Sequence, residues 1–248
     1  MFNIRLENFL SDNKLISINQ NGFKKAHRTE DNIFILQSLY NRYVKTSNKK
    51  IYVAFIDFKK YFDLINRDFL YYKLQGMGIT GNVYSLIKSM YSSCSYNIKC
   101  GAGLSDSILS TSGLKQGCNL SPNLSNIYQN DLHDIFDEAC HPVQLDSRLF
   151  SSMSWADDLV LLSTSVSGLQ NCLNNLHDYC YKWAIAINPE KTVCMTMSKG
   201  RTKNNEIFTP NGTELKNSKE IKYLGFHIKY NMDTKSMIED GILKAKSH

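Results

Sequence analysis

The chain has 248 residues, of which 42% are hydrophobic and 21% are charged, and its net charge is +6 at pH 7. This composition predicts a globular protein with room for a sizeable core and excludes an intrinsically disordered chain. The mild basic excess is compatible with a polyanionic partner but does not identify one. The seven cysteines form no Cys-x-x-Cys pair, so reduced thiols are favoured over a disulfide framework.

No apolar run approaches the roughly 18 residues that a membrane-spanning helix needs. The N-terminal stretch MFNIRLENFL carries acidic and amide residues where a signal peptide would have its apolar segment. We therefore expect an intracellular protein without a signal peptide or a transmembrane segment.

The first half of the chain alternates predicted helices and strands. A helix is expected over residues 32–43, with Thr29 and the acids after it as its cap. The run IYVAFI predicts a buried strand over residues 51–56, which ends abruptly at Asp57. After it we expect, in chain order, helices over 67–74 and 83–91 and a hairpin within 96–117.

The second half continues this mixed pattern. We expect a helix over about 121–136, strands over 148–155 and 159–163, a helix over 168–183, a strand over 192–198 and a hairpin over 221–230. Together the elements predict an α+β fold with helices packed on one face of a small sheet. Cys172, His177 and Cys180 are close in sequence but lack a fourth ligand, so buried residues of a helix face are favoured over a zinc site.

Acidic residues stand at the ends of two predicted strands. Asp57 ends the first strand, and Asp157 and Asp158 occupy the turn of the hairpin in SWADDLVLLS. Neighbouring strands of one sheet could bring these carboxylates together, where they would repel one another unless cations neutralised them. Mg²⁺ prefers such oxygen ligands, and two such ions can activate a hydroxyl and stabilise a leaving pyrophosphate. The alternative is that Ala-Asp-Asp is only a solvated turn.

Six stretches together resemble the motifs of one family, in the same order along the chain. The stretches are QNGFKKAHRTEDNIF, VAFIDFKKYFDLINRDFL, SGLKQGCNLSPNLSNIYQNDL, SWADDLVLLS, WAIAINPEKTVCM and KYLGFHI. They are similar to the motifs of reverse transcriptases of non-LTR (LINE-type) retrotransposons, with Trp155 in place of the more usual Tyr or Phe before Ala-Asp-Asp. The resemblance covers most of the chain.

The resemblance implies a palm-type polymerase right-hand fold, in which helices back an antiparallel sheet. Residues 1–248 would be a single reverse transcriptase domain with partial fingers and little or no thumb. Its expected parts are fingers-like segments over 1–50 and about 76–112, palm-like segments over about 51–75 and 113–230, and the start of a thumb over 231–248. We find no match to the family's Arg-Pro-Ile-Ser-Leu stretch and no endonuclease sequence, so we expect a piece of a longer element protein.

The implied activity is that of an RNA-directed DNA polymerase, which extends a primer by two-metal nucleotidyl transfer. Its cofactor would be two Mg²⁺ ions, for which Mn²⁺ could substitute. Its partners would be an RNA template, a DNA primer and deoxynucleoside triphosphates, and its place of action the nucleus after synthesis in the cytoplasm. Two alternatives stay open, a catalytically inert remnant that at most binds RNA and another two-metal enzyme such as a nuclease; the oligomeric state is also open.

The resemblance also assigns roles to single residues. The metal ligands and catalytic residues would be Asp57, Asp157 and Asp158, with the backbone carbonyl of Phe58 as a further ligand. The residues that bind the incoming nucleotide and its pyrophosphate would be Phe62, Gln116, Gly117 and Lys191. The primer would be positioned by Leu224 and Gly225, and the template contacted by Lys24, Lys25 and Arg28.

Each of these roles outside the aspartates has a structural alternative. Phe62 would otherwise be a core aromatic, and Lys191 an ordinary solvated turn residue. Two polar residues, Asn123 and Ser125, stand where the family usually has apolar ones. If their helix faces the core, they are expected to weaken its packing unless they find hydrogen-bond partners.

Overall fold

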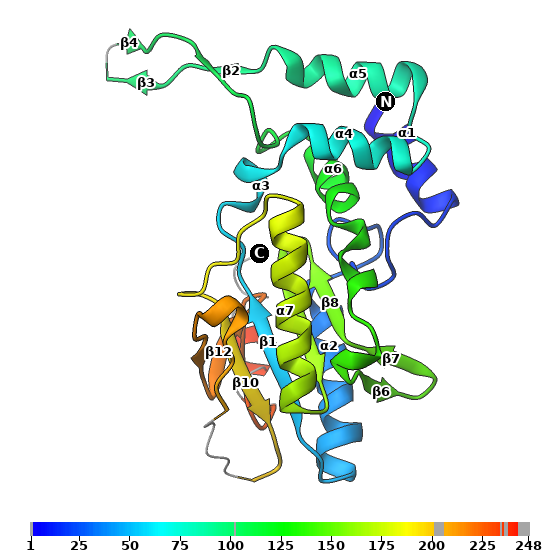
Figure 1. Ribbon diagram of the computed structural model, residues 1–248, viewed down its shortest axis with the longest axis vertical. Coiled ribbons are helices and arrows are strands. Elements are labelled where there is room, and N and C mark those ends of the chain that lie inside the picture. Colours follow the sequence, from blue (N-terminus) through cyan, green and yellow to red (C-terminus); the bar gives the residue numbers. More distant parts are fainter. Residues whose placement is uncertain (1, 102, 201–205, 234, 236–237, 243–248) are drawn as a thin grey trace. The chain divides into compact units, whose positions relative to one another are not determined.

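The computed structural model describes residues 2–101, 103–200, 206–233, 235 and 238–242, which divide into two compact units (Figure 1). The first unit comprises Met1–Ile16, Lys60–Asn130 and Trp183–Ile185. The second unit comprises Ser17–Lys59, Asp131–Lys182 and Ala186–His248. The expected fingers-like and palm-like segments follow other boundaries, and that division stays a prediction.

The second unit is built on a five-stranded sheet. The strand order is β11 (Lys216–Asn217), β10 (Val193–Met197), β1 (Ile51–Ile56), β9 (Asp158–Ser163) and β8 (Ser152–Trp155). All neighbours are antiparallel except β10 and β11, which run parallel. The central strands are nearly all buried along their length, as expected for runs rich in β-branched and large apolar residues.

Secondary structure covers both faces of this sheet. Helix α7 (Val166–Lys182) contacts β1 and β9, and Figure 1 shows it lying along the sheet. The other face packs against α2 (Thr29–Leu39), the π-helical turn η1 (Tyr40–Thr46) and the hairpin of β12 (Glu220–Tyr223) and β13 (Phe226–Lys229). Because alternate side chains of a strand point to opposite faces, Val53 and Phe55 enter this second core. The expectation that helices cover only one face is therefore wrong.

Two local expectations in the second unit need correction. The predicted strand over 148–155 is divided, because β7 (Arg148–Phe150) pairs with β6 (Val143–Leu145) while β8 pairs with β9. The β6–β7 turn places Asp146 at φ 51°, a conformation that Asp tolerates better than most residues. Hydrophobic periodicity does not report such a turn, so the hairpin was not predicted. Helix α2 is capped by Arg28 rather than Thr29, since the Arg28 backbone N–H donates to Asp31 Oδ2 at 2.8 Å.

The first unit is mainly helical. Its helices are α1 (Phe2–Asp12), α3 (Tyr61–Leu64), α4 (Arg67–Gly76), α5 (Gly81–Ser92) and α6 (Ser121–Tyr128). Two small pairings, β2 (Ser95–Tyr96) with β5 (Ile108–Leu109) and β3 (Lys99–Cys100) with β4 (Gly103–Leu104), confirm the predicted hairpin. Helix α1 has no counterpart among the predictions. The predicted helix over 121–136 ends earlier, at Tyr128.

Three short 3₁₀ turns occur later in the chain. The turn η2 (Asn130–Ile135) begins at the end of the first unit, and η3 (Glu138–Cys140) and η4 (Pro210–Gly212) belong to the second unit.

A buried arginine fixes the loop before α6. The Arg67 guanidinium donates to the carbonyls of Gly113 at 2.9 Å, Tyr91 at 3.1 Å and Ser112 at 2.8 Å. Its charge also lies over the Tyr91 ring, 5.1 Å from the centroid. These contacts satisfy the donors of a buried cation, which would otherwise be costly to remove from water.

Cys172 and Cys180 are buried and free on α7, where they pack as small core residues. Among the helices in the described ranges, none has both the length and the hydropathy of a membrane span.

Candidate active site

Strand register brings the three predicted aspartates to one end of the sheet. Strands β1 and β9 pair with Ile56 opposite Leu159, so Asp57, which follows β1, lies level with Asp158. The β8–β9 hairpin closes at the pair Trp155 and Asp158, which leaves Ala156 and Asp157 as its two-residue turn. The carboxylates therefore come from the adjoining ends of two neighbouring strands, as the sequence predicted.

This proximity affects the electrostatics of the turn. The pKa of Asp158 is raised to about 6, first by burial of the carboxyl group among the surrounding protein and then by the charges of Asp157 and Asp57. Part of Asp158 is nevertheless exposed to solvent, which moderates this effect. The pKa of Asp157 is also raised, by burial first and by Asp57 second. The carboxylates of Asp57 and Asp157 thus raise the negative potential around Asp158, which favours the approach of a cation.

The segment INPEKT supports Asp57 through residues that the sequence analysis did not single out. Asn188 donates from Nδ2 to Asp57 Oδ2 at 3.0 Å and from its backbone N–H to the Asp57 carbonyl at 2.7 Å. The backbone N–H of Asp57 donates to Thr192 Oγ1 at 3.2 Å. Lys191, which was predicted to meet the pyrophosphate, lies in the same segment and is exposed. The Asn-Pro turn in this motif was the signal that could have pointed to Asn188.

The carboxylate oxygens of the three aspartates are of the kind that Mg²⁺ prefers, but they would need further ligands from outside the chain. Within the described ranges, no group of three or more His, Cys, Asp or Glu side chains is placed so that it could hold a metal ion. Mg²⁺ typically binds through one or two carboxylates, with substrate phosphates and water supplying the rest. The arrangement of Asp57, Asp157 and Asp158 is compatible with that mode. Phe58, the predicted carbonyl ligand, is buried next to Asp57 and forms a β-bridge with Ile187.

The predicted nucleotide-binding residues Phe62, Gln116 and Gly117 belong to the first unit, whereas the aspartates belong to the second. Phe62 is half-buried and packs edge-on against Tyr61, with ring centroids 5.9 Å apart, so it is not a fully buried core residue. Gln116 donates from Nε2 to Asp63 Oδ1 at 3.0 Å. Gly117 has φ +79°, and apart from Gly117 and its two chain neighbours no described residue has an atom within 4 Å of the position that a Cβ would take.

The predicted primer hairpin has a tight turn. Leu224 and Gly225 have φ values of 48° and 81°, the pattern of a type I′ turn, and join Tyr223 and Phe226 at the end of the hairpin. Tyr223 is a functional candidate that the sequence analysis missed. Its hydroxyl accepts a hydrogen bond from Asn32 Nδ2 at 3.0 Å, and burial, together with the charge of Asp158, raises its pKa.

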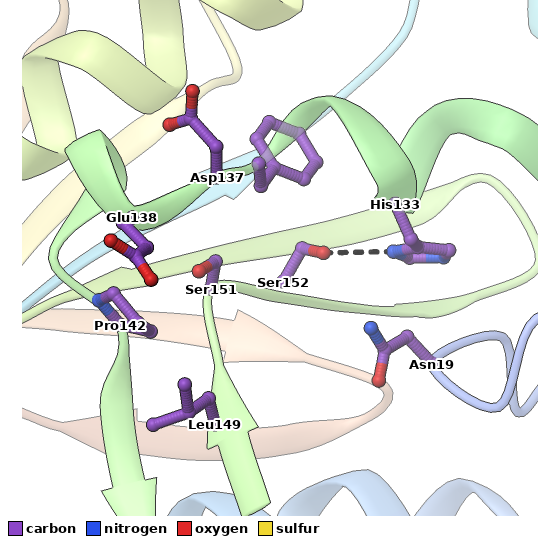
Figure 2. A pocket seen from close by; sticks show the side chains of 9 residues that line it. Asn19, His133, Asp137, Glu138, Pro142, Leu149, Ser151 and Ser152 are labelled. Atoms are coloured by element: carbon purple, nitrogen blue, oxygen red, sulfur yellow. Dashed lines mark hydrogen bonds between the residues drawn. The ribbon is translucent and has the colours of Figure 1, made fainter.

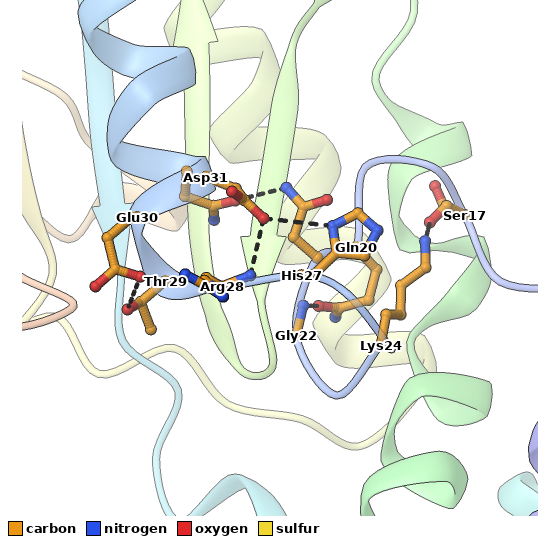
Figure 3. Close-up of polar contacts among 11 residues, drawn as sticks. Ser17, Gln20, Gly22, Lys24, His27, Arg28, Thr29, Glu30 and Asp31 are labelled. Carbon is orange, nitrogen blue, oxygen red and sulfur yellow. Dashed lines mark hydrogen bonds and ion pairs between the residues drawn. The ribbon is translucent and has the colours of Figure 1, made fainter.

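The predicted template residues differ in their surroundings. Lys24 is half-buried and donates from Nζ to the Ser17 carbonyl at 3.1 Å (Figure 3), whereas Lys25 and Arg28 are exposed. The pKa of Lys24 is lowered by burial and then by the charge of Arg148, a residue that was not predicted. No salt bridge to a carboxylate involves Lys24 or Arg148 in the part of the chain that is described. Arg148 donates from its guanidinium to Asn19 Oδ1 at 2.6 Å and lies over the Phe150 ring, 4.6 Å from its centroid.

A cavity of about 240 Å³ lies in the second unit, and none of the predicted site residues lines it. The buried His133 forms part of its wall, together with Asn19 and Ser152 (Figure 2). His133 contacts two hydroxyls of β8, with Nδ1 at 2.8 Å from Ser152 Oγ and Nε2 at 3.1 Å from Ser154 Oγ. This histidine thus braces the strand that leads into the aspartate turn.

A largely antiparallel sheet with aspartates at the adjoining ends of two strands is the arrangement expected of a polymerase palm. Solved structures share this fold: the telomerase of Candida tropicalis, truncated from its C-terminal domain, matches with a TM-score of 0.66 and 15% identity over 94% of this chain and 44% of that one. A second structure of the apo telomerase from that organism matches with a TM-score of 0.63 and 14% identity over 93% of this chain and 39% of that one. These likenesses confirm the predicted right-hand polymerase fold.

The chain belongs to the reverse transcriptase family, because the family described as "Reverse transcriptase (RNA-dependent DNA polymerase)" matches residues 1–228. It is 26% identical to the "Probable RNA-directed DNA polymerase from transposon BS" of Drosophila melanogaster, over 89% of this chain and 24% of that protein. It is 27% identical to the Pol polyprotein of the type-1 retrotransposable element R2 of Popillia japonica, over 78% of this chain and 33% of that protein. The predicted relationship to non-LTR retrotransposon polymerases is confirmed, and the chain spans a quarter to a third of these two relatives.

Proposed function

We propose that this chain carries the polymerase site of an RNA-directed DNA polymerase that extends a DNA primer on an RNA template. In each cycle the 3′ oxygen of the primer forms a bond to the α-phosphorus of a deoxynucleoside triphosphate as the bond to pyrophosphate breaks. The observation that carries the proposal is the convergence of Asp57, Asp157 and Asp158 in a chain of the reverse transcriptase family.

Reverse transcriptases generally use divalent metal ions, and we propose two Mg²⁺ ions for this site, with Mn²⁺ as a substitute. Asp57, Asp157 and the Phe58 carbonyl would hold them, with Asp158 as a further ligand or a neighbouring charge. When bound, such ions would activate the primer hydroxyl and neutralise the leaving pyrophosphate. Asn188 would keep Asp57 oriented, because it binds both the carboxylate and the backbone carbonyl of that residue.

The remaining roles follow the family resemblance. Phe62 would lie under the sugar and disfavour a 2′-hydroxyl, and the half-buried position of its ring is compatible with that task. Gln116 and Gly117 would lie against the nascent base pair, where the open side of Gly117 leaves room for a nucleotide. Lys191 would approach the pyrophosphate, which its exposure allows.

The primer end and the template would contact other parts of the second unit. The turn of Leu224 and Gly225 would position the primer end. Lys24 would contact template phosphates, and the charge of Arg148 beside it supports adding that residue to the site. As the product of a mobile element, the enzyme would be synthesised in the cytoplasm and act on DNA in the nucleus.

Primer extension with purified protein tests the proposal. The wild-type chain should extend a DNA primer on an RNA template only when a divalent cation is present. Asp157→Asn should abolish extension, whereas Asp146→Asn, on the exposed β6–β7 turn, should leave it unchanged. RNA binding without extension by the wild-type chain would favour the inert remnant, and degradation of nucleic acid without nucleotide dependence would favour a nuclease.

A further inference from the structure

The segment before α2 pairs with β8, the edge strand of the aspartate hairpin. Asn21 donates its backbone N–H to the Ser154 carbonyl at 2.9 Å, and Ser154 donates its own to the Asn19 carbonyl at 2.8 Å. Gln20 therefore lies parallel to β8 at Ser154, and it is only 2% exposed. A buried amide at this place must use its hydrogen bonds within the protein.

The Gln20 amide binds both backbone groups of one turn residue. Its Nε2 donates to the Ala156 carbonyl at 3.0 Å, and its Oε1 accepts the Ala156 N–H at 3.0 Å. The same Oε1 accepts the backbone N–H of Gly22 at 2.7 Å, a contact drawn in Figure 3. Only an amide side chain can donate and accept in this way without adding a charge beside the aspartates.

Ala156 has a backbone conformation that benefits from such support. Its φ of +55° lies in the left-handed region, which disfavours residues with a Cβ, and it directly precedes Asp157 and Asp158. The orientation of Ala156 sets the direction in which the chain presents both carboxylates.

Gly22 makes the approach possible. A Cβ at this glycine would lie 2.0 Å from the Ala156 backbone nitrogen and 2.8 Å from its Cα. Two positions of one short segment therefore contact the same residue, Gln20 through hydrogen bonds and Gly22 through the absence of a side chain.

Asn21, which lies between Gln20 and Gly22, links this segment to the primer hairpin. Asn21 Nδ2 donates to Asn32 Oδ1 at 2.5 Å, and Asn32 Nδ2 donates to Tyr223 Oη at 3.0 Å. All three side chains are buried, so the contacts form a continuous polar connection through the core of the second unit.

We propose that Gln20 is a positioning residue that fixes the Ala156 turn and thereby aims Asp157 and Asp158, with Gly22 as the contact that lets it approach. The segment from Gln20 to Gly22 would then support the catalytic turn, in addition to any template contact made by the lysines that follow it. The catalytic consequence rests on the proposed function, whereas the fixing of the turn does not.

Amide hydrogen exchange tests the support of the turn without any turnover. In the wild-type chain the Ala156 N–H should be protected. Gln20→Ala should speed its exchange about tenfold or more, because the acceptor is lost. Gln20→Glu keeps an acceptor for the Ala156 N–H but replaces the donor with a carboxyl oxygen beside the Ala156 carbonyl, so it should retain only part of this protection. Gln144→Ala, at an exposed glutamine of β6, is the matched control and should change nothing at Ala156. Equal Ala156 exchange in wild type and Gln20→Ala would overturn the proposal.

Cation binding and kinetics test the consequence for the aspartates. Under conditions in which both proteins are folded by circular dichroism, Gln20→Ala should bind Mn²⁺ about tenfold more weakly than wild type. It should also lower kcat for primer extension at least about tenfold, with little change in KM for the nucleotide. Unchanged Mn²⁺ affinity and unchanged kcat would overturn the proposed aim of the carboxylates.

The two proposals fail differently. A wild-type chain that binds Mn²⁺ but never extends a primer would contradict the proposed function, and the Mn²⁺ affinity of Gln20→Ala would still decide the role of Gln20. A wild-type chain that binds no Mn²⁺ would contradict both the proposed function and the aiming of the carboxylates.

Discussion

Acidification should destabilise the strand that carries the aspartate turn, through His133. The side chain is 7% exposed, and both ring nitrogens contact hydroxyls of β8. Burial, and secondly the charge of Lys24, lower its pKa from 6.5 to about 4. The folded protein therefore binds fewer protons than the unfolded chain between these two pH values, so the contribution of His133 to stability is complete above pH 6.5 and is lost as the pH falls toward 4.

The size of the effect follows from the two pKa values. Each pKa unit corresponds to about 1.4 kcal/mol, so the full contribution is about 3 kcal/mol, and about 2 kcal/mol of it is lost by about pH 5. Urea denaturation at about pH 7.5 and about pH 5 measures this loss as a free energy of unfolding. His133→Gln keeps a polar side chain but cannot take up the proton, so it should lose about 2 kcal/mol less than wild type between the two pH values.

His27→Gln is the matched control, because His27 is exposed in the loop before α2. Its loss of stability between the two pH values should remain close to that of wild type. If His133→Gln and wild type lose the same stability on acidification, the argument from burial is wrong.

Two further predictions concern the other polar groups of the chain. The Ser125 hydroxyl is buried in α6 without a hydrogen-bond partner among the described residues, so Ser125→Ala should be neutral or stabilise by about 1 kcal/mol in urea denaturation. Ser121→Ala should instead destabilise by about 1 kcal/mol, because Ser121 Oγ donates to the Lys115 carbonyl at 2.6 Å, and the opposite order of the two variants would contradict this reasoning. Lys24→Gln and Arg148→Gln should each reduce the slope of log affinity for single-stranded RNA against log salt by about 0.7 in a binding titration, and unchanged slopes would remove these residues from the RNA site.

Much of the fold could be predicted from local pattern. The apolar runs at β1, β9 and β10 and the periodic segments at α4, α5 and α7 have clear ends, and the structure confirms each of them. Asn123 of α6 was expected to weaken packing unless it found a hydrogen-bond partner. It has one, because its Nδ2 donates to Asn3 Oδ1 at 2.9 Å, and Asn3 lies on α1, a helix that was not predicted. Hydrophobic periodicity reports which face of an element is buried, and it does not report what covers that face.

The same limit explains the elements that were mistaken. The β6–β7 hairpin and the second covered face of the sheet depend on which segments pair, and that choice is made by contacts between residues far apart in the chain. The helix α1 carries Phe2, Leu6, Phe9 and Leu10 at helical spacing, a pattern that the sequence analysis did not use.

The sequence by itself determined the family, the order of its motifs and the place of the aspartates at strand ends, because acids at strand ends and ordered motifs are local features. The tertiary structure decided how those acids are supported. Asn188 is 131 positions from Asp57, and Gln20 is 136 positions from Ala156. A hydrogen bond between such distant residues exists only once β1, β8 and the segments beside them have packed, and no periodicity or spacing in the sequence encodes its geometry.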